Sequence, residues 1–259
     1  MSKPHIHPTG RRIALVTGAA GGLGTAQVEA LSEAGMLVVA HARTASRRLD
    51  ALVERTGAIA AVRDLDDPEA TRSLVRETVA STGRLDVLVA NHATMSMSAL
   101  ADADAAEWWR VVRTNLLGTF ALTQEAARAM RAHGDGGRIV IISSEWGVTG
   151  WPNASAYAAS KAGLVSLVKC LGRELAPEGI LVNAIAPGVI DTPQLQVDAD
   201  DASVDLQTMR KRYAEGIPLG RVGRATEIAE AVQFLADPAL AAMAGQTMQI
   251  NGGATRGRV

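Results

Sequence analysis

Short runs of apolar residues alternate with longer stretches of helical periodicity along nearly the whole chain. The apolar runs predict seven strands, over residues 12–17, 36–40, 58–62, 85–90, 138–142, 181–186 and 246–250. Because these runs lack a clean polar alternation, we expect helices to cover both faces of their sheet. Strands that take turns with helices favour right-handed crossovers and a parallel arrangement. The pattern therefore predicts an α/β fold with one doubly wound, seven-stranded parallel sheet.

Helix signals stand between the predicted strands. Residues 25–34 follow a helical pattern, and Pro68 opens a further helix with Asp67 as its expected cap. The amphipathic stretch 224–236 stops at an Asp-Pro pair. These helices are long enough to connect neighbouring parallel strands.

The composition excludes several classes of protein. Lys and Arg number 26 against 27 Asp and Glu, so there is no basic field to hold nucleic acid. No apolar run reaches the roughly 18 residues that cross a bilayer, and the polar start lacks the apolar core of a signal peptide, so we expect no membrane partner and a cytoplasmic location. Cys170 is the single cysteine and excludes an internal disulfide; we expect it to be a small buried group. Five scattered histidines predict no metal site.

The chain shows no linker, repeat or low-complexity segment. Its length suits one large α/β domain or two small ones. We therefore expect one domain over residues 11–259, preceded by a loose tail over residues 1–10.

A glycine-rich turn joins the first predicted strand to the first helix. Residues 17–24 read Thr-Gly-Ala-Ala-Gly-Gly-Leu-Gly, a spacing of Gly-x-x-x-Gly-x-Gly rather than Gly-x-Gly-x-x-Gly. Glycines let the backbone approach a pyrophosphate, and the helix N-terminus offers it free amides and positive potential. A glycine cluster also suits a plain tight turn, but its place between strand and helix favours a nucleotide site.

A tyrosine and a lysine four residues apart, Tyr157 and Lys161, share one face of a predicted helix. A phenol normally titrates near pH 10, and a nearby ammonium lowers that pKa. Such a pair is able to move a proton to or from an alcohol or carbonyl oxygen. Because similar pairs are common on surface helices, other residues must decide between the two interpretations.

Three further polar residues lie at positions that suit either a structural or a functional role. Ser143 and Ser144 end the fifth predicted strand, at the carboxyl edge where α/β sheets bind ligands. Asn115 falls on or near an apolar stripe with helical spacing. A buried amide is costly unless its hydrogen bonds are met, so Asn115 is either a structural bridge or a functional group.

With these motifs in this order, the chain resembles the short-chain dehydrogenase/reductase family. The resemblance rests on the glycine-rich turn, on Tyr157-x-x-x-Lys161, and on residues 91–94 (Asn-His-Ala-Thr), 187–192 (Pro-Gly-Val-Ile-Asp-Thr) and 245–253. It covers nearly the whole chain after the tail, and the five motifs keep family-like spacing. The second and fourth residues of the segment 91–94, His92 and Thr94, depart from the family's Asn-Asn-Ala-Gly beside the expected nicotinamide pocket.

The resemblance implies a Rossmann-type dinucleotide-binding fold and a catalytic set of Asn115, Ser144, Tyr157 and Lys161. The family's serine lies thirteen residues before its tyrosine, which selects Ser144 and leaves Ser143 as the alternative. In the family, the serine orients the substrate oxygen and the tyrosine exchanges the proton. The lysine bonds the nicotinamide ribose and lowers the tyrosine pKa, while the asparagine helps to hold a water on the proton path.

The end of the second strand bears on the cofactor. NAD enzymes of this fold carry an acid there, whereas this chain has Ala42 followed by Arg43, with Arg47 and Arg48 nearby. A guanidinium pairs bidentately with a 2′-phosphate, so NADP(H) is predicted. Gly21 stands where some NADP-preferring relatives carry a basic residue, which keeps NAD(H) as the alternative. The other expected cofactor contacts are Gly18, Gly22, Leu23, Gly24, Asp64, Leu65, Asn91, Ala93, Tyr157, Lys161, Pro187, Gly188, Ile190 and Thr192.

The substrate pocket is expected to be largely apolar. Its predicted wall consists of Met95, Glu145, Trp146, Trp151 and Leu195. Methionine and tryptophan suit a ketone with an apolar body better than a free sugar, although such residues also serve core or subunit packing. Glu145 is the polar exception, placed to read a substrate hydroxyl or amine or to face water. Residues 194–212 are expected to form a mobile lid.

The leading hypothesis is an NADP(H)-dependent oxidoreductase that interconverts a ketone or aldehyde and an alcohol, similar to 3-oxoacyl-carrier-protein reductases. The resemblance also implies a homotetramer. One alternative is an NAD-dependent sugar or cyclic-alcohol dehydrogenase, and another is a nucleotide-sensing relative without turnover. The presence of all four catalytic residues favours an enzyme.

Overall fold

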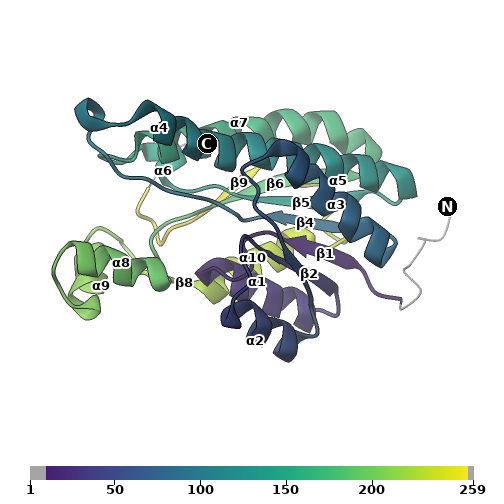
Figure 1. The fold of residues 1–259 in the computed structure, drawn as a ribbon, viewed down its shortest axis with the longest axis horizontal. Coiled ribbons are helices and arrows are strands. Elements are labelled where there is room, and N and C mark those ends of the chain that lie inside the picture. Colours follow the sequence, from purple (N-terminus) through teal and green to yellow (C-terminus); the bar gives the residue numbers. More distant parts are fainter. Residues whose placement is uncertain (1–9, 256–259) are drawn as a thin grey trace.

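The computed structural model describes residues 10–255, so nearly all of the predicted N-terminal tail lies outside the described residues. Its centre is a parallel sheet with strand order β3-β2-β1-β4-β5-β6-β9 (Figure 1). The strands are β1 Ile13–Val16, β2 Leu37–Ala42, β3 Ile59–Val62, β4 Val87–Ala90, β5 Gly137–Ile142, β6 Ile180–Pro187 and β9 Thr247–Ile250. This confirms the predicted seven-stranded, doubly wound α/β sheet, with ends that differ by only a few residues.

Helices cover both faces of the sheet, as the buried strands require (Figure 1). The principal helices are α1 Gly22–Glu33, α2 Arg47–Thr56, α3 Pro68–Thr82, α4 Ala105–Val112, α5 Thr119–His133, α6 Trp146–Thr149, α7 Ser155–Leu175, α8 Pro193–Asp201, α9 Leu206–Glu215 and α10 Ala225–Ala236. The short turns η1 Leu100–Asp102 and η3 Ala176–Glu178 are 3₁₀-helical, and η2 Arg113–Gly118 is π-helical.

Alternate strand residues divide the core into two layers. In β1, Ala14 and Val16 pack into one apolar cluster with α1, α2 and α10, whereas Leu15 packs into the other with α3, α5 and α7. The side-chain period of two explains this division. Asp67 accepts a hydrogen bond from the amide of Ala70 and caps α3, as predicted.

The segment after β6 differs from the sequence expectation. A two-stranded sheet pairs β7 Ile190–Asp191 with β8 Gly223–Arg224, and the predicted lid is the helical pair α8 and α9. These helices stand apart from the main layers in Figure 1 and share a small apolar cluster that includes Leu195, Met209 and Ile217.

Cys170 is exposed, which corrects the prediction that it is buried. The buried stripe of α7 includes Leu164, Val168, Gly172 and Leu175, spaced three and four residues apart. Residue 170 falls on the opposite face of that helix.

No helix within residues 10–255 is both long and apolar enough to cross a bilayer. The same residues contain no group of three His, Cys, Asp or Glu side chains arranged to hold a metal ion.

Candidate active site

Two adjoining cavities lie at the carboxyl edge of the sheet. The first, of about 220 Å³, contains the predicted chemical residues, and the second, of about 380 Å³, contains the glycine-rich turn. Leu23, Asn91, Ala93 and Thr192 line both cavities, so the two form one continuous trough. Its position matches the general rule that parallel α/β sheets bind ligands beyond the carboxyl ends of their strands.

The glycine-rich turn is shaped by close packing as well as by conformation. Gly18 has a φ of +67°, and a Cβ on Gly24 would lie 2.2 Å from the carbonyl oxygen of Gly18. A Cβ on Gly22 would lie 2.6 Å from the Thr192 side chain. The turn thus brings bare backbone and the N-terminus of α1 to the cavity, which suits a pyrophosphate.

The end of β2 offers a cation and hydroxyl groups to the same cavity. Arg43 is exposed and lines it together with Thr44 and Ser46. Sequence reasoning missed these hydroxyl residues, for which the only signal was their position directly after the second strand. Arg47 and Arg48 begin α2 and do not line the cavity.

His92, one of the departures from the family motif, is held in a buried network. Its Nδ1 lies 3.0 Å from the Thr17 hydroxyl, and its Nε2 lies 3.2 Å from the Thr114 carbonyl. Burial, with smaller effects from neighbouring positive charges, lowers the pKa of His92 to about 3. The ring is therefore neutral and binds the end of β4 to η2 while it lines the cofactor side of the trough.

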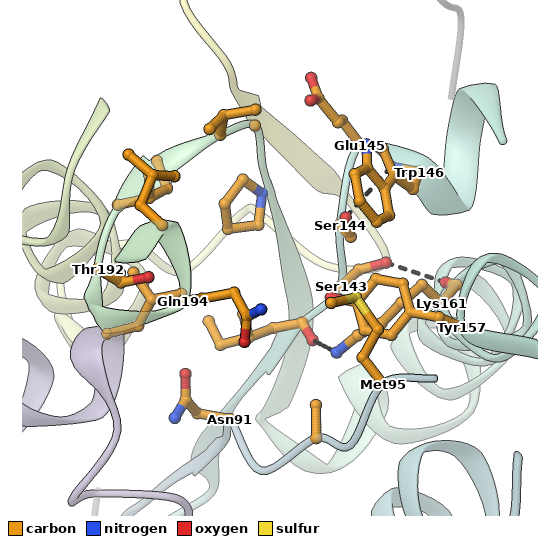
Figure 2. A pocket seen from close by; sticks show the side chains of 18 of the residues that line it. Asn91, Met95, Ser143, Ser144, Glu145, Trp146, Tyr157, Lys161, Thr192 and Gln194 are labelled. Carbon is orange, nitrogen blue, oxygen red and sulfur yellow. Dashed lines mark hydrogen bonds between the residues drawn. The ribbon is translucent and has the colours of Figure 1, made fainter. Parts of the chain in front are cut away.

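Tyr157, Lys161 and Ser144 meet in the first cavity (Figure 2). Tyr157 and Ser144 both line this cavity, and the Lys161 ammonium lies 5.4 Å from the centre of the tyrosine ring. Lys161 is 2% exposed, and its Nζ donates to the carbonyl of Ile142 at 2.8 Å. The two hydroxyl groups are thus placed to converge on a single substrate oxygen.

The pKa shifts at this site contradict the expectation that the pKa of Tyr157 is lowered. Burial raises the pKa of the Tyr157 phenol, and the hydrogen bond with Ser144 acts in the opposite direction. Burial lowers the pKa of Lys161 to about 8. The ammonium of Lys161 therefore does not outweigh the effect of burial on the phenol. The phenol is held protonated at neutral pH, which is the form that donates a proton.

The two serines at the end of β5 are distinguished by their hydrogen bonds. The Ser143 hydroxyl is buried and donates to the carbonyl of Lys161 at 2.9 Å, which ties β5 to α7. The Ser144 hydroxyl accepts from the amide of Trp146 at 3.2 Å and lines the same cavity as Tyr157. This geometry favours Ser144 as the residue that contacts a substrate.

Asn115 lies behind the cavity rather than in its wall. It is fully buried in the π-helical turn η2, where its Oδ1 accepts from the amide of Thr94 and its Nδ2 donates to the carbonyl of the same residue, both at 2.8 Å. The Nδ2 also donates to the Ser160 hydroxyl at 3.1 Å. Asn115 therefore ties the loop after β4 to α7 at the residue that directly precedes Lys161.

The predicted substrate wall is largely assembled, with one correction. Met95, Glu145, Trp146 and Leu195 line the cavity. Trp151 does not line it, because its ring stacks on the far side of Trp146, at 5.1 Å between centroids and 5° between planes. Gln194, Asp198 and Tyr213 complete the wall and were not predicted individually; the first two lie in the segment 194–212 predicted as a lid, and Tyr213 directly follows it.

Three predicted cofactor residues lie outside both cavities. Asp64 is exposed and accepts the amide of Asp66, and Leu65 is buried in the core. Gly24 packs against the turn instead of facing the trough. The other predicted cofactor residues, Gly18, Gly22, Leu23, Arg43, Asn91, Ala93, Tyr157, Lys161, Pro187, Gly188, Ile190 and Thr192, line one or both cavities.

The fold and trough define a dinucleotide-binding oxidoreductase, and comparisons with known proteins agree. The family profile described as Enoyl-(Acyl carrier protein) reductase matches residues 18–255. Nodulation protein G of Azospirillum brasilense is 37% identical, with 94% of this chain and 98% of that protein covered. The 3-oxoacyl-acyl-carrier-protein reductase of Escherichia coli K12 is 37% identical, with 93% and 96% covered.

A solved structure gives the same result. A proposed short-chain alcohol dehydrogenase of Sinorhizobium meliloti 1021 superposes with a TM-score of 0.86 at 37% identity, with 95% of this chain and 97% of that chain covered. The chain belongs to the short-chain dehydrogenase/reductase family, whose members use a nicotinamide cofactor to oxidise alcohols or reduce carbonyl groups.

Proposed function

We propose that this protein is an NADP(H)-dependent oxidoreductase that interconverts a ketone or aldehyde and an alcohol. The observation that carries the proposal is that adjoining cavities hold a glycine cradle and the side chains of Ser144 and Tyr157, with Lys161 beneath. When bound, the cofactor supplies or accepts the hydride. The bare backbone at the N-terminus of α1 fits its pyrophosphate.

The chain's own residues supply the acid–base chemistry. Tyr157 gives its proton to the substrate oxygen during reduction and receives one during oxidation. Ser144 donates a hydrogen bond that orients this oxygen and stabilises its developing charge. Lys161 presents a cation at the floor of the cavity, and Asn115 fixes the loop opposite it.

The decisive experiment is the Tyr157→Phe variant, tested against a panel of ketones and aldehydes with NADPH. Without its general acid the enzyme should reduce them about 10²-fold more slowly or worse, while NADPH still binds. The rate of NADPH consumption measures carbonyl reduction, and titration with NADPH measures cofactor binding. A variant as fast as the wild type would refute the mechanism, and a wild type that binds NADPH but reduces no carbonyl would favour the nucleotide-sensing alternative.

The choice of NADP(H) is supported by Arg43, Thr44 and Ser46 in the cofactor cavity and by the lack of an acid at the end of β2. A charge-assisted hydrogen bond to the 2′-phosphate predicts that Arg43→Asp lowers the preference for NADPH over NADH by roughly 10- to 100-fold. The matched change Arg48→Asp, outside the cavity, should have a smaller effect. An unchanged preference in Arg43→Asp would favour the NAD-dependent alternative.

The assembly expected from the resemblance is a homotetramer, and the location expected from the composition is the cytoplasm. Trp109, Leu117 and Phe120 are exposed along α4, η2 and α5, which supports an interface on these helices. Light scattering of the purified protein tests the tetramer, and a monomer would contradict it.

A further inference from the structure

The substrate end of the first cavity is acidic. Glu145 and Asp198 line it, and Lys161 is the one basic side chain among its described lining residues. Lys161 lies beneath Tyr157 with its Nζ bonded to a backbone carbonyl, so it belongs to the reacting centre and not to the outer wall. A bound substrate therefore projects its body toward carboxylates.

Asp198 is the main acidic group. One of its oxygens accepts from the Gln194 amide at 3.0 Å, and the other accepts from the Tyr213 hydroxyl at 3.1 Å. Burial, followed by the charge of Asp198, raises the pKa of Tyr213 to about 12. Because each carboxylate oxygen has two lone pairs, Asp198 keeps acceptor capacity at the cavity wall.

Glu145 is a second acidic residue, which follows β5 in the chain and lies beside the end of β6. It is 8% exposed, and its Oε2 has no hydrogen-bond partner within the described part of the chain. A Cβ on Gly188 would lie 3.1 Å from that oxygen, so the carboxyl group forms a closely packed wall. Burial raises the pKa of Glu145, and a hydrogen bond with Asn251 acts in the opposite direction, so Glu145 contributes a polar wall and a weaker charge than Asp198.

We infer that this pocket selects carbonyl substrates that carry an ammonium or hydroxyl group away from the carbonyl, and that it rejects substrates with a carboxylate there. The inference rests on the proposed function and specifies its substrate class. Trp146 and Tyr213 contribute aromatic faces, which also attract cations. Asp198 is only half-buried, so solvent screens its charge. At a separation of about 8 Å and an effective dielectric constant near 60, the attraction of a cation and the repulsion of a carboxylate should each change the relative rate by roughly 3-fold, and the ratio of the two by roughly 10-fold.

Three aromatic ketones of similar size test the charge preference. Para-(aminomethyl)acetophenone, para-methylacetophenone and para-acetylbenzoate present a cation, a methyl group and a carboxylate on one skeleton. The wild type should show the highest kcat/KM for the cation and the lowest for the carboxylate at neutral pH. Asp198→Asn should reduce the ratio between these two by about 10-fold, and Glu145→Gln should reduce it less.

The chain offers a matched control on the same helix. Asp200 is exposed, lies outside the cavity, and accepts from Gln196 in the same four-residue spacing that joins Asp198 to Gln194. Asp200→Asn should therefore change the ratio by less than about 2-fold. A wild type that reduces the carboxylate ketone as well as the methyl ketone would overturn the inference, and so would an equal loss of selectivity in Asp200→Asn.

A binding measurement separates this inference from the proposed function. Quenching of tryptophan fluorescence, with Trp146 in the wall, reports the affinity of the NADP⁺-loaded protein for each ketone, because no hydride is available there to reduce it. If no ketone is reduced but the cation still binds best, the proposed function fails and the charge preference stands. If ketones are reduced without any charge preference, the opposite holds.

Discussion

The two edges of the sheet treat buried charge differently. At the amino edge, Arg84 pairs with Asp86 at 2.5 Å and with Asp135 at 3.1 Å, and Asp86 also accepts the amide of Ile13. At the carboxyl edge, Lys161 forms no ion pair within the described part of the chain. Glu145 there keeps one oxygen without a partner in the same described part.

This difference separates residues that serve stability from residues kept for chemistry. A buried charge is costly unless it is paired, and the cost appears as a shifted pKa. Such shifts cluster where a protein binds or transforms a ligand. At the amino edge the buried charges are paired with each other. At the carboxyl edge a cation and a carboxyl group remain for a ligand to meet.

The largest expected effect on stability is at the amino edge. Asp86→Ala leaves the buried Arg84 without its nearest partner and the Ile13 amide without an acceptor, so it should lower the free energy of unfolding by about 3–5 kcal/mol. Chemical denaturation measures this loss. The activity of the remaining folded protein should be unchanged.

An exposed ion pair supplies the control. Glu77 pairs with Arg63 at 2.7 Å, and the two side chains are 60% and 33% exposed. Glu77→Ala should therefore cost no more than about 1 kcal/mol. Equal losses of unfolding free energy in Asp86→Ala and Glu77→Ala would mean that burial does not determine how much the Arg84–Asp86 pair contributes to stability.

At the carboxyl edge, removing the buried charge should raise the free energy of unfolding instead of lowering it. Burial lowers the pKa of Lys161 from 10.5 to about 8, so holding its charged form at neutral pH costs up to about 3 kcal/mol. Lys161→Met keeps the apolar stem and removes the charge. The variant should be more stable by about 1–3 kcal/mol while its carbonyl reduction falls about 100-fold or more.

The exposed Lys169 on the same helix provides the comparison. Lys169→Met should change the free energy of unfolding by less than about 0.5 kcal/mol and leave turnover intact. A Lys161→Met variant less stable than the wild type would show that the lysine is a structural anchor through its bond to Ile142.

The sequence predicted the sheet well because its signals are local. Buried strands are continuous apolar runs, and the glycine-rich turn carries its own conformational requirement at Gly18. Tyr157 and Lys161 share a helix face, so their juxtaposition also follows from local spacing. Each of these predictions needed no knowledge of which distant segments meet.

The rest of the site depends on long-range packing that a single sequence does not encode locally. Asp198 and Tyr213 reach the cavity only because α8 and α9 fold together over it. Trp151 was placed in the pocket by its proximity in sequence, yet it stacks behind Trp146. Likewise, the pKa of Tyr157 is set by enclosure that spacing alone does not reveal.

The titration of Lys161 predicts a pH dependence in which activity and stability move in opposite directions. Lys161 is charged below its pKa of about 8, so kcat/KM for carbonyl reduction should fall about tenfold per pH unit above that value. Because the folded-state pKa is lowered, the cost of burying the charge is present below about 8 and is relieved as the pH rises toward 10.5. The contribution of Lys161 to the free energy of unfolding should therefore rise across that window. Unfolding free energies of the wild type and of Lys161→Met are measured across this pH range, and their difference isolates the contribution of Lys161 from those of other titrating groups. A difference that does not change with pH would show that Lys161 keeps an ordinary pKa despite its burial.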